Sequence, residues 1–409
     1  MHVALFTPAW PPGTVANGIV TYVAAMRAEL LRQGHRVSLF SPDVRIEAPD
    51  VHPVAASPTE RVVDALVARL SRRDRTVFDL GKTIAATIRR VHARDPIDVV
   101  EMEESFGWAG AVAAATSLPV VCKLHGPAFL TLVAAELATD PGREKVRREG
   151  EALARLAVIV APSRYTLKET LAHYSLHPAA AEHVVNPVAP PERLELWDPV
   201  RCERDRVLFV GRFDAVKGGD LMVLAFQRLL ARRPDARLVF VGPDPGVLRS
   251  DGSAVRLRDF IASLGDRALA DAITTTGAVA PAQVAELRPR AAVTVVASRR
   301  ESQGYTALEA MLQACPVVVT DTSGLSEIVE HGVTGLKARP DDPEDLARQI
   351  ERVLDDRELA RSLGAAGRAF VLREHAPAAV VARMLAVYRR AIEARGAPAL
   401  AGHRNASSP

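Results

Sequence analysis

The sequence has few cysteines, little net charge and no long apolar run, and these shortages exclude several classes of protein. Its three cysteines, Cys122, Cys202 and Cys315, lie far apart and form no CxxC pair, which argues against a disulfide framework and against a zinc site. No run of about 18 apolar residues is present, and MHVALFTPAW lacks the charged and apolar regions of a secretory signal. We therefore expect a cytoplasmic protein with no membrane span.

The net charge is +3 although 25% of the residues are charged, and arginine supplies most of the cations. This balance does not indicate a nucleic-acid partner. A hydrophobic content of 48% is typical of a globular chain, and 409 residues suit two domains better than one core. The sequence does not reveal the oligomeric state.

Two series of short valine-rich runs alternate with amphipathic helical patterns such as 19–32 and 80–94. Such runs are typical of strands that are buried on both faces of a parallel sheet. The first series comprises 1–6, 36–40, 97–100, 120–123 and 158–161, and the second comprises 207–210, 237–241, 273–275, 293–296 and 317–320. The pattern predicts two α/β domains.

The proline-rich stretch 186–191, followed by Trp197-Asp198-Pro199, predicts the linker between the domains. We place the first domain at 1–190 and the second at 200–377. The helical pattern 378–395 is expected to cross back onto the first domain, and the polar tail 396–409 to be disordered. Two parallel sheets joined in this way face a shared cleft with the carboxyl ends of their strands.

The loop GRFDAVKGG follows the predicted strand 207–210 and carries Arg212 and Lys217. An arginine fork and a lysine point charge together suit the binding of two phosphates. Isolated basic pairs are more often solvated surface residues. The flanking glycines and the position at a strand end favour a phosphate site here.

The stretch ESQGYTALEAM places Glu301 and Glu309 around a glycine turn where a helix begins. A helix N-terminus attracts phosphate, whereas carboxylates accept hydrogen bonds from hydroxyl groups. A diphosphate flanked by hydroxyls is a nucleotide sugar, so this ligand fits the stretch. The alternative is that both glutamates only stabilise the start of the helix.

Two further candidates lie in loops of the first domain. Gly18 starts a predicted helix, where a glycine would let the backbone approach a ligand closely. The alternative is that Gly18 is a plain turn residue. The sequence here lacks the GxGxxG pattern, which argues against a nicotinamide or flavin enzyme. His125 follows the predicted strand 120–123, where titration near neutrality would suit proton transfer. Most of the eleven histidines are expected to be ordinary surface or core residues.

The ordered set of motifs resembles the retaining, nucleotide-sugar-dependent glycosyltransferases of the GT-B fold, family four. The resemblance covers nearly the whole chain, through NGIVTYVAAMRAELLRQGH, KLHG, APSRYT, NPV, GRFDAVKGG, ESQGYTALEAMLQACPVV and SGLSEIVEHGVTGL. It implies two Rossmann-like domains facing a central cleft and a hexosyl-type transfer with retention. It also implies a nucleotide-sugar donor, no cofactor and no metal.

The resemblance also implies roles for single residues. Glu301 is expected at the donor-sugar hydroxyls, Glu309 at the ribose, and Arg212 and Lys217 at the diphosphate. His125 is expected near the donor sugar. The remaining phosphate contacts are the Gly18 loop and the backbone N–H groups around Gly304, Tyr305 and Thr306. Two departures from the family pattern are Asn17-Gly18 in place of two glycines and Gln303 in place of phenylalanine.

The stretch EMEESFGW, at the end of the predicted strand 97–100, is the candidate binding segment for the acceptor. If the strand continues, alternation sends Glu101 and Glu103 to the same face. We expect them to bind a small polar acceptor bearing an amine, such as an amino sugar or cyclitol, with Trp108 or Phe106 stacking on its ring. The alternative is that these carboxylates face water or pair with arginines.

Other functions stay open on the sequence alone. The arginine-rich amphipathic stretch 61–75, RVVDALVARLSRRDR, is compatible with peripheral contact at the inner membrane face and a lipid or polysaccharide acceptor, or with a solvated helix. An epimerase acting on the nucleotide sugar, or a non-catalytic binder of it, are further alternatives.

Overall fold

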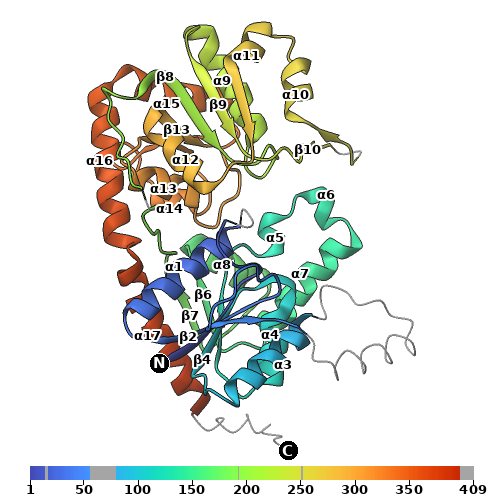
Figure 1. Cartoon of the computed structure of the whole chain (residues 1–409). Helices are drawn as coiled ribbons and strands as arrows, with labels where there is room; N and C mark the ends of the chain where they lie inside the picture. Colours follow the sequence, from blue (N-terminus) through green and yellow to red (C-terminus); the bar gives the residue numbers. More distant parts are fainter. Residues whose placement is uncertain (14–16, 56–79, 192, 250–251, 397–409) are drawn as a thin grey trace, which may run out of the picture.

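The computed structural model describes residues 1–13, 17–55, 80–191, 193–249 and 252–396. The chain forms two α/β domains, one above the other in Figure 1, each built around its own parallel sheet. The stretch 61–75 and residues 397–409 of the tail lie outside the described residues. No helix in the described part of the chain has the length and apolar character needed to span a bilayer.

The first sheet has seven strands in the order β3-β2-β1-β4-β5-β6-β7, and all its pairings are parallel. The strands are β1 (His2–Phe6), β2 (Arg36–Ser41), β3 (Val51–Pro53), β4 (Val99–Met102), β5 (Val120–Lys123), β6 (Val158–Ala161) and β7 (Ala180–His183). Its helices are α1 (Gly18–Arg32), α3 (Leu80–His92), η2 (Ser105–Gly107), α4 (Trp108–Ala115), α5 (Ala128–Thr131), α6 (Ala134–Leu137), α7 (Asp140–Leu153) and α8 (Arg164–His173).

The alternation of side chains along β1 divides this domain into two cores. Val3 and Leu5 pack in one cluster with residues of α1 and of the C-terminal helix α17 (Pro377–Gly396). Ala4 and Phe6 pack in another with residues of α3 and α4. Because both faces of the sheet are covered, its strands read as continuous apolar runs.

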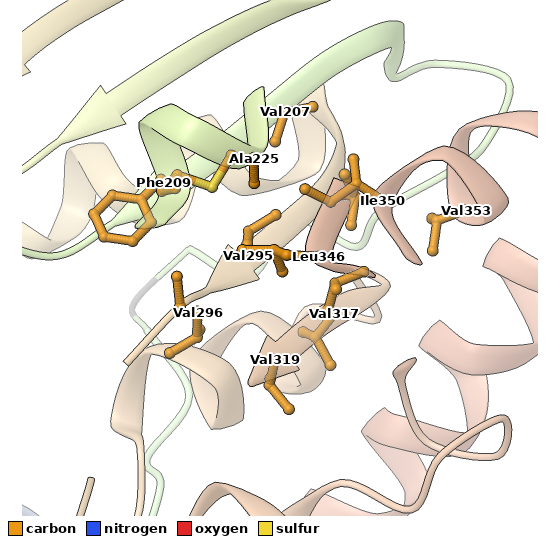
Figure 2. Close-up of a cluster of buried hydrophobic side chains, with 14 of the residues drawn as sticks. Val207, Phe209, Ala225, Val295, Val296, Val317, Val319, Leu346, Ile350 and Val353 are labelled. Atoms are coloured by element: carbon orange, nitrogen blue, oxygen red, sulfur yellow. The ribbon is translucent and has the colours of Figure 1, made fainter. Parts of the chain in front are cut away.

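The second sheet has six parallel strands in the order β12-β9-β8-β13-β14-β15. They are β8 (Glu203–Val210), β9 (Arg237–Val241), β12 (Ile273–Gly277), β13 (Ala291–Val296), β14 (Val317–Thr320) and β15 (Leu336–Ala338); β10 (Val247–Leu248) and β11 (Ala254–Val255) form a separate hairpin. The helices are α9 (Gly219–Arg232), α10 (Leu257–Ser263), α11 (Arg267–Ala272), α12 (Pro281–Leu287), η3 (Arg288–Arg290), α13 (Tyr305–Leu312), α14 (Leu325–Ile328), α15 (Pro343–Asp355) and α16 (Arg357–Glu374). Figure 2 shows side chains of β8, β13 and β14 packed with those of α9 and α15, among them Val207, Val295, Val317 and Leu346.

The chain passes between the domains twice. The first passage is the extended segment between β7 and β8, and the second joins α16 to α17. Helix α17 runs down beside the first domain (Figure 1) and packs against α1, β4 and β5. Its Val380, Met384 and Tyr388 are fully buried in the core shared with α1. The last described helix is therefore part of the first domain's core.

Candidate active site

The loops after two neighbouring strands, β8 and β13, bring a lysine and a glutamate together. Lys217 Nζ lies 2.6 Å from a carboxylate oxygen of Glu301. The hydroxyl of Ser298 donates to the same oxygen at 3.2 Å, and the Glu301 backbone N–H donates to the Ser323 hydroxyl. The residues that the sequence places at a diphosphate and at a sugar are thus direct neighbours.

Arg212 joins this group through Asp214. The Asp214 carboxylate accepts from Arg212 Nε at 2.6 Å and from the Lys217 backbone N–H at 2.7 Å. The Arg212 side chain is 52% exposed and that of Lys217 is 32% exposed, so both cations can reach a ligand. Asp214 itself was not predicted, because a single aspartate in a glycine-rich loop has no distinguishing signal.

Gly218 explains the glycine pair in this loop. It has a φ of +67°, and a Cβ at this position would lie 1.8 Å from the carbonyl oxygen of Ala297. Only glycine allows the loop to pass this close to the end of β13. The short distance between Lys217 and Glu301 depends on that approach.

The N-termini of α13 and α1 meet from opposite domains. Gly304, with a φ of +91°, caps α13, and the first-turn N–H groups of Tyr305 and Thr306 have no acceptor within the helix. A Cβ on Gly18 would lie 3.6 Å from the Tyr305 ring. Asn17, the departure from the family pattern, caps α1 by accepting from Ile19 N–H at 2.8 Å. Two positive helix ends therefore face the same region.

Glu309 lies on α13, and its half-exposed carboxylate accepts a hydrogen bond from the buried guanidinium of Arg288. The ion pair fixes the orientation of the carboxylate while one side stays open to solvent. Arg288 was not predicted, since it belongs to η3 and comes near α13 only in the folded chain.

His125 has a different electrostatic character from the one expected. Its ring packs edge-on against Tyr22 of α1, with ring centroids 4.8 Å apart. Burial and the nearby charge of Lys123 lower its pKa to about 3. The imidazole is therefore neutral at physiological pH and is a hydrogen-bonding group, not the proton carrier that titration near neutrality would give.

Glu101 and Glu103 do not form the exposed pair that the sequence predicted. Their residues are 3% and 4% exposed. The Tyr388 hydroxyl of α17 donates to Glu101, and the Ser105 backbone N–H donates to Glu103. Strand β4 ends at Met102, so the alternation does not continue, and both carboxylates lie inside the domain. Neither is available in this structure to bind an acceptor amine.

Glu104 and Glu149, which sequence reasoning missed, hold the His125 loop. Glu104 is 2.9 Å from the His125 backbone N–H and 2.6 Å from that of Gly126. Glu149 of α7 accepts from the Ala128 backbone N–H at 2.7 Å. Burial, with the neighbouring charge of Glu104, raises the pKa of Glu149 to about 8. The only sequence signal was the run of acidic residues after β4.

Replacing Glu149 by Gln is expected to make thermal stability less dependent on pH. Folding raises the pKa of Glu149 above its ordinary value of 4.5, so the folded state loses stability as pH rises from that value through about 8. Glutamine keeps an acceptor for Ala128 without ionising. Between about pH 6 and 8.5, the melting temperature of Glu149→Gln should fall by several degrees less than that of the parent.

The matched control is Glu144→Gln on the same helix. Hydrogen bonds from Arg147 and Arg148 lower the pKa of Glu144 to about 2, so it does not titrate in this window. The melting temperature of Glu144→Gln should change with pH as steeply as that of the parent. Equal slopes for all three proteins would contradict the buried-carboxylate explanation.

Gln303, the second departure from the family pattern, is buried. Its amide oxygen accepts from the Asn186 backbone N–H at 2.9 Å, and its amide nitrogen lies 3.4 Å from His375 Nδ1. Asn186 lies in the first passage between the domains and His375 at the end of α16. Gln303 therefore links the Glu301 loop to both passages between the domains.

The described residues contain no group of three or more His, Cys, Asp or Glu placed to hold a metal ion. Of the predicted residues, the structure brings Lys217, Glu301, Arg212 and the start of α13 together, and places Gly18 opposite them. His125 lies in the first domain beside Tyr22, and its neighbour Gly126 faces Ser302: a Cβ on Gly126 would lie 3.3 Å from the Ser302 hydroxyl.

Comparison with known sequences identifies the family of the chain. Residues 16–192 match the family described as Glycosyltransferase Family 4, and residues 200–370 match Glycosyl transferases group 1. The chain is 30% identical to a D-inositol 3-phosphate glycosyltransferase of Acidothermus cellulolyticus, over 83% of this chain and 78% of the relative. The chain belongs to glycosyltransferase family 4. It is thus a retaining enzyme that takes a sugar from a nucleotide donor.

A second relative supports the assignment of this family 4 enzyme, and two solved structures share its fold. D-inositol 3-phosphate glycosyltransferase 1 of Catenulispora acidiphila is 30% identical over 95% of both chains. Sucrose-phosphate synthase from Thermosynechococcus elongatus has the same fold, with a TM-score of 0.73 and 23% identity over 96% of this chain and 99% of that one. Anabaena HepE in complex with UDP-glucose aligns with a TM-score of 0.65 and 16% identity, over 95% of this chain and 100% of HepE. The fold is GT-B, as the sequence predicted.

Proposed function

We propose that this family 4 enzyme transfers a hexosyl group from a nucleotide sugar to a hydroxyl of a small cyclitol-type acceptor. The observation that carries the proposal is the Lys217–Glu301 pair, which lies where the second domain's strand ends meet the start of α13. This pair offers a cation for a diphosphate beside a carboxylate for sugar hydroxyls.

The donor would bind with its diphosphate between the N-terminus of α13 and the two cations. Tyr305 and Thr306 would donate backbone N–H groups, and Lys217 and Arg212 would supply positive charge. Lys217 would then exchange Glu301 for phosphate, which frees Glu301 to accept from the donor sugar. Glu309, already oriented by Arg288, would accept from the ribose hydroxyls.

The chemical step would depend on fixed electrostatics. As the bond from the anomeric carbon to the diphosphate breaks, negative charge grows on the leaving group, and preorganised cations stabilise it. Neutral His125 would hydrogen-bond the donor sugar or its phosphate. Attack by the acceptor hydroxyl on the face that the diphosphate leaves would retain the anomeric configuration, with the leaving phosphate taking the proton. Arg212 and Lys217 would thereby perform the neutralisation that a metal ion performs in other transferases.

Acceptor choice follows from the relatives and from the buried glutamates. Several similar enzymes are D-inositol 3-phosphate glycosyltransferases, which supports a cyclitol. The preference for an amine rested on Glu101 and Glu103, and their burial removes its support. A lipid or polysaccharide acceptor rested on 61–75, outside the described residues. We infer a cytoplasmic location, since all three cysteines are free thiols.

The test is an acceptor screen read by mass spectrometry. UDP-, GDP- and ADP-hexoses are each paired with a free cyclitol, a phosphorylated cyclitol, an amino sugar and a neutral sugar. The expected product is a hexosyl cyclitol, formed by the parent and lost in Glu301→Gln. Conversion of the donor without a sugar-linked product would favour an epimerase, and a product only with amino sugars would restore the amine preference.

A further inference from the structure

Arg299, which follows β13 by three residues, contacts the loop that carries Lys217. Its backbone N–H donates to the Val216 carbonyl at 2.9 Å, and its Nη1 donates to the Ala215 carbonyl at 2.8 Å. These two contacts hold the turn immediately before Lys217. Because Arg299 is also two residues from Glu301, it connects both members of the central ion pair.

The guanidinium is itself fixed by acidic partners. It forms a bidentate pair with Asp220 in the first turn of α9, at 2.7 and 2.9 Å, and its Nε donates to Asp341. The hydrogen bonds and charge of Asp220 raise the pKa of Arg299 above its ordinary value, so the guanidinium stays cationic. A planar fork with five donors can satisfy these acceptors together, whereas an ammonium group cannot match the geometry.

The close approach at Gly218 makes this fixation necessary. The loop passes so near the end of β13 that no Cβ fits at Gly218, and within the turn the Asp214 carboxylate accepts from the backbone N–H of Lys217 at 2.7 Å. A small shift of the turn relative to β13 would move Lys217 Nζ away from Glu301 and from a bound diphosphate. Displacements of about 1 Å at a reacting centre can cost about 10²-fold in rate.

We propose that Arg299 is a positioning residue that holds the 214–218 turn against β13 and so sets the place of Lys217. The proposal rests on the proposed role of Lys217 at the diphosphate. In this role Arg299 acts through the lysine loop, which its side chain and backbone contact directly. Its effect should therefore disappear when Lys217 is absent, which a purely structural role would not produce.

The test is a double-mutant cycle measured as kcat for sugar transfer. Arg299→Ala should lower kcat by about 10- to 100-fold, and Arg299→Lys by less. In a Lys217→Ala background, Arg299→Ala should change kcat by less than about twofold, because the two residues act as a unit. Additive losses, or unchanged kcat in Arg299→Ala, would overturn the proposal.

The matched control is Arg232→Ala. Arg232 pairs with Glu344 and Glu351 between α9 and α15 of the same domain, and its side chain is 34% exposed against 29% for Arg299. Circular dichroism is recorded to check the folding of each variant, and Arg232→Ala should leave kcat within about twofold of the parent. A loss in this control equal to that of Arg299→Ala would mean a general effect of domain stability and would overturn the proposal.

Hydrogen exchange tests the positioning role of Arg299 separately from the proposed glycosyl transfer. Amides of residues 214–219 should exchange faster in Arg299→Ala than in the parent or in Arg232→Ala. This readout requires no transfer activity, so it decides the role of Arg299 even if no tested acceptor is glycosylated and the proposed function fails. Unchanged exchange in this segment would refute the positioning role.

Discussion

Lys217→Ala is expected to lower kcat by about 10²- to 10³-fold, the largest kinetic effect that the structure predicts. Charge develops on the diphosphate as the glycosidic bond breaks, so the lysine stabilises the transition state more than the bound donor. The KM for the donor should change much less than kcat. Initial rates at varied donor concentration measure both quantities.

Two variants separate the loss of charge from other effects of this change. Lys217→Arg keeps the cation beside Glu301 and should recover part of kcat, while Arg212→Ala should lower kcat in the same direction. Removal of Lys217 also frees Glu301 from its 2.6 Å contact, so circular dichroism and melting of each variant are recorded. Turnover equal to that of the parent in Lys217→Ala would eliminate the lysine from the chemical step.

Glu101→Leu should reduce the free energy of unfolding by about 3 kcal/mol, the largest stability effect expected. Glu101 and Lys123 are both buried in the first domain; burial lowers the pKa of Lys123 to about 7, while the charge of Glu101 counteracts this shift. Without the carboxylate, Lys123 loses its strongest opposing charge and keeps the Val184 carbonyl, the Tyr22 ring and the charge of Glu104. Urea unfolding followed by circular dichroism measures the loss.

A double variant tests whether the cost comes from the unpaired charge. Glu101→Leu with Lys123→Met removes both buried ionisable groups and should recover most of the stability, because apolar residues can replace buried opposite charges. Tyr388→Phe should cost about 1–2 kcal/mol by removing one hydrogen bond to Glu101. A Glu101→Leu protein as stable as the parent but altered in acceptor KM would return Glu101 to the acceptor site.

The fold was predictable because most strands are covered on both faces. Valine-rich runs mark the strands β5, β6, β8, β13 and β14 for this reason. The edge strands β3, β7 and β15 were missed, since a strand of three or four residues that pairs on one side leaves no periodic signal. Val51–Pro53 even contains a proline, which edge positions tolerate.

The site was predictable where the carboxyl ends of neighbouring parallel strands bring loops together. Lys217 and Glu301 follow β8 and β13, which are adjacent, but their ion pair could not be seen before the loops were placed. His125, Glu101 and Glu103 were interpreted from their local pattern, whereas burial sets their chemistry. The burial of His125 and Glu101 depends on α1 and α17, which are distant in sequence from both.

The return of α17 has a consequence for how the protein emerges from the ribosome. Its Val380, Met384 and Tyr388 complete the core that α1 begins, so residues made more than 300 positions apart must meet before that core is closed. The second domain can form as soon as its own strands and α16 are synthesised. The first domain, although made earlier, must wait until α17 arrives, with the part of one apolar face that α1 does not cover still exposed. Vectorial synthesis therefore reverses the order in which the two domains are finished.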